Sequence, residues 1–272
     1  MVSKTQDPNH TTLDGEAELD QYVLSHSDDE PEYLYRLWRA TNIHMLHGRM
    51  ASGRLQGRLL KMLVQMIRPR NILEIGTFSG YSALCMAEGL EAPSQHLQAP
   101  SQPPRGEEQE ITVNRSDGVK KPSRAVKQMP LGQELEGGCV YTFEINDEQE
   151  DFTRPWIEHS PWADRVRFMI GDAITEAPRL AREEGIMFDM AFLDGDKRTY
   201  VDTYEAILPL MPSGAYILAD NTLWDGHVTD PAYQRDPQTR GIRAFNDHIM
   251  QDDRVTRVIL PLRDGLTIIR KK

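Results

Sequence analysis

From residue 71 to the end of the chain, short apolar segments alternate with helical patterns, and this alternation constrains the fold most strongly. Strands that alternate with helices form parallel βαβ units with right-handed crossovers. The last two apolar segments are joined at Arg263-Asp264-Gly265, a tight-turn signature. We therefore predict an α/β fold with a doubly wound, mostly parallel, seven-stranded sheet and an antiparallel C-terminal edge strand. The predicted strands are 71–76, 139–145, 165–171, 188–195, 214–220, 255–262 and 265–270, and the predicted helices are 81–90, 148–157, 177–184, 200–208 and 239–250.

Two segments lie outside this alternation. Residues 1–31 are polar and acidic and predict a tail, with a short helix near 16–24. Residues 92–137 are rich in Pro, Gln, Ser and charged residues, and they show neither helix nor strand periodicity. We interpret them as an insertion in one βα connection; a lid or partner-binding loop is the alternative. A helical pattern over 32–67 then opens a single domain that spans 32–272.

The net charge of −11 argues against two classes of partner. Nucleic acids and anionic membranes both require clustered Lys and Arg, so we expect neither as a partner. Cys85 and Cys139 lie in apolar segments without a CxxC pair, which indicates free thiols and a reducing compartment. The first residues lack the pattern of a secretory signal, so we expect a cytoplasmic protein.

A glycine turn follows the first predicted strand in LEIGTFSGYS. Its GxxxG spacing differs from the GxGxxG fingerprint of dinucleotide sites, and the turn suits a nucleoside without phosphates better than a pyrophosphate. Glu144, at the end of the second strand, is the candidate for ribose hydroxyls once the insertion is discounted. Asp172 and Ala173 follow the third strand and are placed to line an adenine. A plain tight βα turn is the alternative reading of the glycines.

Acidic residues follow two strands that we expect to be neighbours. Asp194 ends the fourth strand, and Asp220 and Asn221 end the fifth. Adjacent strands lie about 4.8 Å apart, so these side chains could reach one ion. Carboxylate and amide oxygens favour Mg²⁺, Mn²⁺ or Ca²⁺ over Zn²⁺. Alternatively, both aspartates only cap the loops that follow them.

Five segments, LEIGTFSGYSA, VYTFEIND, FLDGDKRTY, LADNTLWDGHV and PLRDGLTI, together resemble the cation-dependent O-methyltransferases of the catechol and caffeoyl-CoA type, which use S-adenosyl-L-methionine. The resemblance covers about residues 35–272 apart from 92–137, and it implies a Rossmann-like class I methyltransferase fold. It implies a divalent cation, most simply Mg²⁺, at Asp194, Asp220 and Asn221, with Lys197 as the catalytic lysine alongside Asp194. Trp224 and Asp225 match a loop that lines the acceptor pocket. The positions implied for the cofactor are Ser52 at the start of a covering helix, Glu74, Gly76, Thr77, Ser82, Glu144, Ala173 and Asp196.

The chemistry explains why such residues gather. A phenol has a pKa of about 10, so at neutral pH only about one molecule in a thousand is ionised. A cation on the phenolic oxygen lowers that barrier, and vicinal hydroxyls chelate the same ion. Lys197 can accept the proton only if its pKa is depressed, which we expect from burial and a neighbouring cation. The resemblance therefore implies a small hydroxylated aromatic as the acceptor, and it alone implies a homodimer.

The residues alone leave three other functions open. A methyltransferase with the same cofactor site could act without a metal. A nicotinamide-dependent oxidoreductase is disfavoured by the missing GxGxxG. A non-catalytic binding protein is disfavoured because the charged strand ends are intact.

Overall fold

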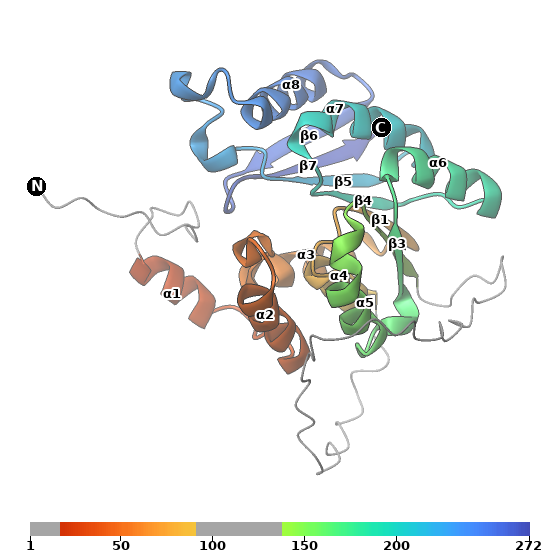
Figure 1. Cartoon of the computed structure of the whole chain (residues 1–272). Helices are drawn as coiled ribbons and strands as arrows, with labels where there is room; N and C mark the ends of the chain where they lie inside the picture. Colours follow the sequence, from red (N-terminus) through yellow and green to blue (C-terminus); the bar gives the residue numbers. More distant parts are fainter. Residues whose placement is uncertain (1–16, 91–137) are drawn as a thin grey trace, which may run out of the picture.

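The structure, a computed structural model, describes residues 17–90 and 138–272 and contains one seven-stranded sheet between two layers of helices (Figure 1). Its strand order is β3-β2-β1-β4-β5-β7-β6. This confirms the predicted mostly parallel, doubly wound sheet. The strands are β1 (Asn71–Ile75), β2 (Cys139–Glu144), β3 (Val166–Ile170), β4 (Met190–Leu193), β5 (Tyr216–Asp220), β6 (Val255–Leu260) and β7 (Leu266–Lys271).

The C-terminal hairpin is antiparallel, as expected, but its order in the sheet adds a detail. β7 pairs antiparallel with both β5 and β6, so β7 lies inside the sheet and β6 forms its edge. After β5 the chain therefore forms β6, the outermost strand, and then returns to form β7 between β5 and β6.

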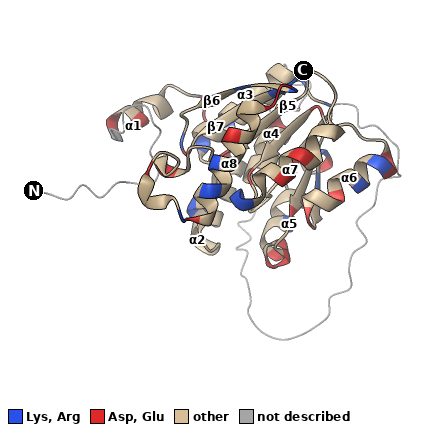
Figure 2. Cartoon of the chain, turned by 90° about the horizontal axis from the view of Figure 1, so that it is seen from above, with Lys and Arg blue, Asp and Glu red and all other residues tan. Residues whose placement is uncertain are grey.

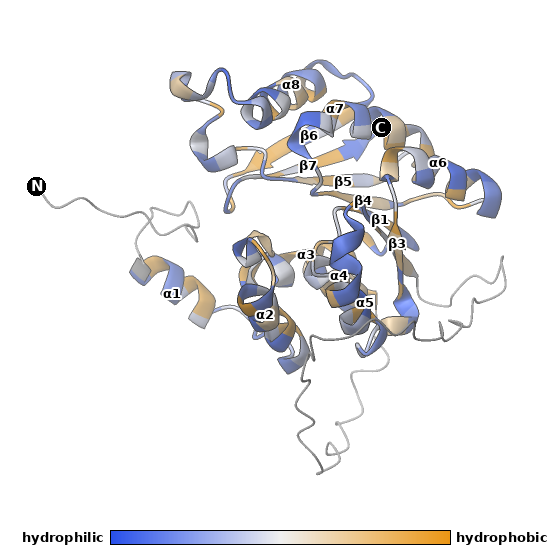
Figure 3. Ribbon diagram, in the orientation of Figure 1, coloured by the Kyte–Doolittle hydropathy of each residue, from blue (hydrophilic) through white to orange (hydrophobic). Residues whose placement is uncertain are grey.

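Helices cover both faces of the sheet, and the strands between them are mostly apolar and buried (Figure 3). One core cluster joins a sheet face to α6, α7 and α8; the other joins the opposite face to α2, α3, α4 and α5. A parallel sheet needs both faces covered, which explains why its central strands read as continuous apolar runs. The helices are α1 (Ala17–Ser25), α2 (Glu32–His44), α3 (Arg54–Ile67), α4 (Tyr81–Gly89), α5 (Glu150–Glu158), α6 (Ala173–Glu184), α7 (Tyr200–Ile207) and α8 (Pro237–Gln251).

The helical pattern predicted over 32–67 is interrupted. α2 ends at His44, and the chain then makes a short 3₁₀ turn, Gly48–Met50, before α3 begins. The backbone of Gly53 is extended and precedes the first residue of α3. Ser52 therefore lies before α3 and not within the first turn of that helix.

The N-terminal helix near 16–24 corresponds to α1, whereas residues 1–16 lie outside the described residues. The insertion predicted at 92–137 also lies outside them. The structure does describe Leu90 and Gly138, which flank residues 91–137. A Cβ placed on Gly138 would lie 3.0 Å from Leu90 Cδ2, so these two flanking residues are neighbours. Within the described residues, no helix is both long and apolar enough to cross a bilayer.

Charged positions of both signs are interspersed along the helices. In the view of Figure 2, α6 carries blue and red positions side by side, and its Arg179 pairs with Glu176 and Glu183. Cys85 and Cys139 are free and buried, as predicted.

Candidate active site

The turn after β1 packs directly against the end of β4. Gly76 has φ +97°, and a Cβ there would lie 2.4 Å from the backbone oxygen of Asp194. The backbone N–H of Asp194 in turn donates to the oxygen of Ile75 at 2.9 Å. Only glycine fits this left-handed, crowded position. The predicted glycine turn and the first predicted metal ligand are therefore in contact.

Buried polar groups line the β1 side of this turn. Glu74 is fully buried, and its Oε2 accepts a hydrogen bond from Thr142 Oγ1 at 2.5 Å. Thr77 Oγ1 lies 2.6 Å from the same threonine hydroxyl. Burial raises the pKa of Glu74 to about 8, and the nearby carboxylates of Asp194 and Glu144 act in the same direction.

Two buried oxygens near this turn have no hydrogen-bond partner among residues 17–90 and 138–272: Glu74 Oε1 and Ser79 Oγ. Unpaired buried polar atoms are costly and uncommon in folded proteins. Their position at the end of β1 and in the turn that follows it indicates a place where a polar ligand would supply the missing partners.

Glu144 joins the end of β2 to the same turn. Its Oε2 accepts from the backbone N–H of Phe78 and its Oε1 from that of Asn146, both at 2.9 Å. A carboxylate has about four lone-pair positions, so each oxygen can still accept from a hydroxyl. Phe78 itself has φ +48°, which is unfavourable for a side chain of that size.

The other predicted cofactor positions are spread around the strand ends. Ser82 and Ala173 are buried in the first turns of α4 and α6, where Asp172 caps α6 by accepting from the N–H of Ile174. Ser52 is buried in the segment before α3. Asp196 is exposed and pairs with Arg198.

The predicted metal ligands leave adjacent strands. β4 and β5 pair in parallel with Leu193 opposite Ala219, so Asp194 and Asp220 are the next residues along each strand. The pKa of Asp194 is raised to about 6, first by burial and further by Asp220. Asn221 follows with φ +58° and donates its backbone N–H to Asp220 Oδ1 at 2.9 Å.

Lys197 is buried beside these carboxylates. Its Nζ donates to Asp194 Oδ1 at 2.8 Å and to the hydroxyl of Tyr200 at 3.0 Å. The same hydroxyl lies 3.1 Å and 3.0 Å from the backbone oxygens of Leu193 and Asp220, which links Lys197 to both strand ends.

Burial lowers the pKa of Lys197, as expected, but the protein's own groups shift it upward overall, so the predicted depression would depend on the cation. Burial is the largest single influence and disfavours the ammonium, but Asp194 and Tyr200 together outweigh burial and raise the pKa of Lys197. The carboxylate expected to bind the ion also pairs with the lysine, and burial alone does not indicate this pair. Paired in this way, Lys197 is a proton donor.

The predicted acceptor loop lies on the same side. Lys197 Nζ is 6.0 Å from the centre of the Trp224 ring. Trp224 and Asp225 both have positive φ, which strains the 3₁₀ turn Trp224–Gly226. Burial and Asp225 raise the pKa of Asp264 to about 6, and Asn221 Nδ2 lies 3.4 Å from Asp264 Oδ2.

Four residues of this edge were not selected from the sequence. Gln56 Nε2 donates to Asp220 Oδ2 at 2.7 Å, and Arg263 donates to Gln56 Oε1, also at 2.7 Å. Tyr200 was interpreted only as the start of a helix. A signal for Gln56 existed, because it occupies the same helix face as the buried Leu60 and Val64. Arg263 and Asp264 were interpreted only as a turn.

Comparisons with known proteins agree with this geometry. A family model described as O-methyltransferase matches residues 24–113 and 127–272. Caffeoyl-CoA O-methyltransferase 1 of Zea mays is 28% identical over 273 residues, which cover 96% of this chain and 88% of the relative. The Arabidopsis thaliana protein of the same name is 25% identical over 277 residues, covering 98% and 89%. An O-methyltransferase from Bacillus cereus, solved in complex with SAH, superposes with a TM-score of 0.71 at 27% identity, covering 94% of this chain and 97% of that one.

The chain therefore belongs to the O-methyltransferase family. This membership confirms the resemblance seen in the motifs and the expectation of an S-adenosylmethionine-dependent O-methyltransferase. It also favours a methyltransferase over the oxidoreductase and the binding protein that the residues alone left open.

Proposed function

We propose that this enzyme transfers a methyl group from S-adenosyl-L-methionine to a hydroxyl of a small catechol-like or hydroxycinnamoyl-type acceptor, with a divalent cation at the strand ends. Mg²⁺ is the first candidate, and Mn²⁺ or Ca²⁺ are alternatives. One observation carries this proposal: the turn after β1 touches Asp194, which stands next to Asp220 on the paired strand. A cofactor at the turn and a cation at the carboxylates would then be neighbours.

The residues around the turn fit the proposed cofactor. Unpaired oxygens of Glu74 and Ser79 offer acceptors and a donor to its polar groups, and the tight turn between Gly76 and Gly80 brings backbone close. Glu144 retains accepting capacity for ribose hydroxyls. When bound, S-adenosylmethionine supplies the electrophilic methyl group. The residues assigned to hold it are Ser52, Glu74, Gly76, Thr77, Ser82, Glu144, Ala173 and Asp196.

The donor set at β4 and β5 fits a hard cation. Asp194, Asp220 and Asn221 offer oxygen ligands without a histidine or thiol, as Mg²⁺, Mn²⁺ and Ca²⁺ prefer. A cation held there would favour the ionised form of an acceptor hydroxyl. The remaining contribution of the protein is to position the acceptor and to handle its proton.

Lys197 is the residue assigned to that proton. Its ammonium depends on the negative charge of Asp194, so any partner that neutralises this carboxylate makes Lys197 easier to deprotonate. The hydroxyl of Tyr200 keeps the Nζ directed toward the strand ends.

Trp224 and Asp225 are assigned to the acceptor. The half-buried indole stands near Lys197 and offers a flat apolar surface to an aromatic ring. Several relatives are named for caffeoyl-CoA, which makes hydroxycinnamoyl thioesters a natural class to assay beside free catechols.

A metal-independent methyltransferase is the second candidate, and one observation favours it. The ammonium of Lys197 already neutralises Asp194 at 2.8 Å. Methylation of a panel of catechols and hydroxycinnamoyl compounds, with EDTA or with added Mg²⁺, separates the two candidates. Turnover that is undiminished in EDTA would contradict the cation-dependent proposal.

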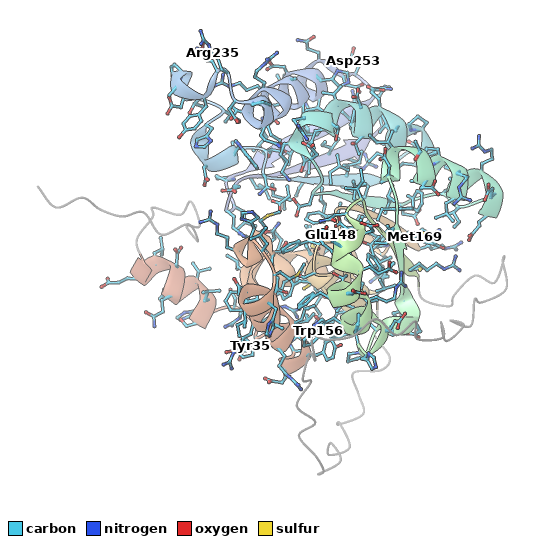
Figure 4. All side chains as sticks on the ribbon, viewed as in Figure 1. Tyr35, Glu148, Trp156, Met169, Arg235 and Asp253 are labelled. Atoms are coloured by element: carbon cyan, nitrogen blue, oxygen red, sulfur yellow. The ribbon has the colours of Figure 1, made fainter. Side chains whose placement is uncertain are left out.

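Replacement of Asp220 by Ala tests the ligand assignment. We expect Asp220→Ala to lose at least about a hundredfold in Mg²⁺-stimulated turnover, because one charged ligand is lost, while S-adenosylmethionine affinity changes little. Asp253→Ala is the control, since Asp253 is exposed and lies at the end of the α8 layer (Figure 4). Steady-state methylation and calorimetric cofactor titration give both readouts, and equal turnover of Asp220→Ala and the parent would refute the assignment.

A further inference from the structure

Gln56 carries a buried amide, and both ends of that amide are hydrogen-bonded. It is 1% exposed, on the face of α3 that meets the sheet. Its Nε2 donates to Asp220 Oδ2 and its Oε1 accepts from Arg263, both at 2.7 Å. The three side chains come from α3, from the end of β5 and from the turn between β6 and β7.

Arg263 and Asp220 determine which way the amide of Gln56 points. A guanidinium can only donate, so the atom of Gln56 that faces Arg263 must be the oxygen. The amide nitrogen then faces Asp220, where it donates to the carboxylate. The carboxylate of Asp220 can only accept, so it favours the same orientation, and Arg263 reinforces it from the other end of the amide.

Gln56 in turn restrains the carboxylate of Asp220. Oδ1 accepts from the backbone N–H of Asn221 at 2.9 Å, and Oδ2 accepts from Gln56. Each oxygen keeps a further lone pair, so the group is held by the protein and can still bind a cation. Partners that orient a ligating carboxylate commonly change metal affinity about 10- to 100-fold when removed.

Arg263 is itself held in place. It has φ +50°, unfavourable for an arginine, and its guanidinium lies 3.4 Å from the backbone oxygen of Ala51. Ala51 precedes Ser52, in the segment before α3. The turn between β6 and β7 is thereby connected to the segment assigned to the cofactor.

We propose that Gln56 and Arg263 are positioning residues for the cation site: Arg263 orients the amide of Gln56, and Gln56 orients the carboxylate of Asp220. This inference rests on the proposed cation site at Asp194, Asp220 and Asn221. It assigns two residues that act through Asp220, and neither needs to touch cofactor or acceptor.

A simple charge effect makes the opposite prediction for Arg263. If its positive charge only repelled a cation, Arg263→Met would bind the cation more tightly. If it orients Gln56, the same substitution weakens binding in spite of the lost repulsion. Arg263→Lys keeps the charge and one donor, so it rescues binding only under the positioning model.

The test is direct Mn²⁺ binding by the full-length protein, measured by electron paramagnetic resonance without acceptor. We expect Gln56→Leu and Arg263→Met each to weaken Mn²⁺ binding about tenfold. Arg263→Lys should stay within threefold of the parent. Gln65→Leu, on the exposed face of the same helix, and Arg235→Met, an exposed arginine near the start of α8 (Figure 4), are controls expected to bind as the parent does.

For every variant, the affinity for S-adenosylhomocysteine and the melting temperature in EDTA are also measured. A structural role would lower both, whereas positioning of Asp220 leaves them near the parent values. Mn²⁺ binding that is unchanged in Gln56→Leu, or tighter in Arg263→Met, overturns the inference and leaves the proposed function intact. A parent protein that binds no Mn²⁺ overturns the cation proposal and this inference together.

Discussion

At the residue scale, the environment of a side chain sets its chemistry more than its type does. Glu74 and Glu144 end neighbouring strands, yet Glu74 is fully buried with one unpaired oxygen, and Glu144 accepts two backbone N–H groups. Lys197 gives the same lesson, because Asp194 raises the pKa that burial alone would lower. The position after the second predicted strand identified Glu144, and the family resemblance identified Glu74 and Lys197. The protonation of Glu74 and Lys197 depends on which atoms surround them.

Glu74 predicts a pH dependence of stability. Its pKa rises from 4.5 to about 8 on folding, so the folded state binds the proton more tightly than the unfolded state. The stability from this group is complete below pH 4.5 and is lost as the pH rises through 8. Glu74→Gln keeps an acceptor for Thr142 and removes the titration.

We therefore expect Glu74→Gln to gain stability relative to the parent between pH 5 and pH 8.5. The gain should be at least about 1 kcal/mol, the worth of one pKa unit, or about 2–4 °C in melting temperature. Thermal unfolding of both proteins without ligands, at several pH values, measures it. A difference that stays constant across this range would show that Glu74 does not ionise there.

At the element scale, α3 and α4 pack so closely that they share a buried ion pair. Arg58 donates to both oxygens of Glu88, at 3.0 Å and 2.5 Å, and both side chains are 7% exposed. A Cβ at Gly57 would lie 2.8 Å from Cys85 Sγ, so glycine permits the close approach. This pair fixes α3, which carries Gln56, against α4, whose start follows the cofactor turn.

Breaking this ion pair should destabilise the protein strongly. Glu88→Gln leaves the buried guanidinium of Arg58 without its countercharge and also breaks the pair of Glu88 with Lys61, and we expect a loss of about 3–5 kcal/mol in unfolding free energy. Glu176→Gln is the control, because its ion pair with Arg179 lies on an exposed face and should cost less than about 1 kcal/mol. Urea unfolding measures both losses, and similar losses in the two variants would contradict the role assigned to burial.

At the scale of the whole molecule, the fold places Leu90 and Gly138, which flank residues 91–137, next to each other. Gly138 has φ +93°, and a Cβ there would lie 2.8 Å from the backbone oxygen of Arg70 and 3.0 Å from Leu90. A short connection could therefore join α4 to β2. The family match also leaves out residues 114–126, within this gap.

Replacement of residues 92–136 by a six-residue Gly-Ser linker tests whether the segment is an insertion. Each halving of a flexible loop lowers its closure cost by about 0.6 kcal/mol, so we expect stability equal to the parent or up to about 2 kcal/mol higher. Methylation should persist with the same cation requirement. Chemical denaturation and activity assays decide, and a loss of stability would show that the segment packs against the domain.

The sequence by itself determined the order of strands and helices and the residues at the strand ends, because periodicity and turn signals act over a few neighbouring positions. It also fixed the family through five separate motifs. Only the tertiary structure brought Gln56 to Asp220, across 164 positions of chain, and Arg263 to Gln56, across 207. Those contacts depend on how α3 and the C-terminal hairpin dock on the sheet, and no local pattern encodes that docking. The protonation of Lys197 and Glu74 was decided there too, since burial and neighbouring charge exist only once the chain is packed.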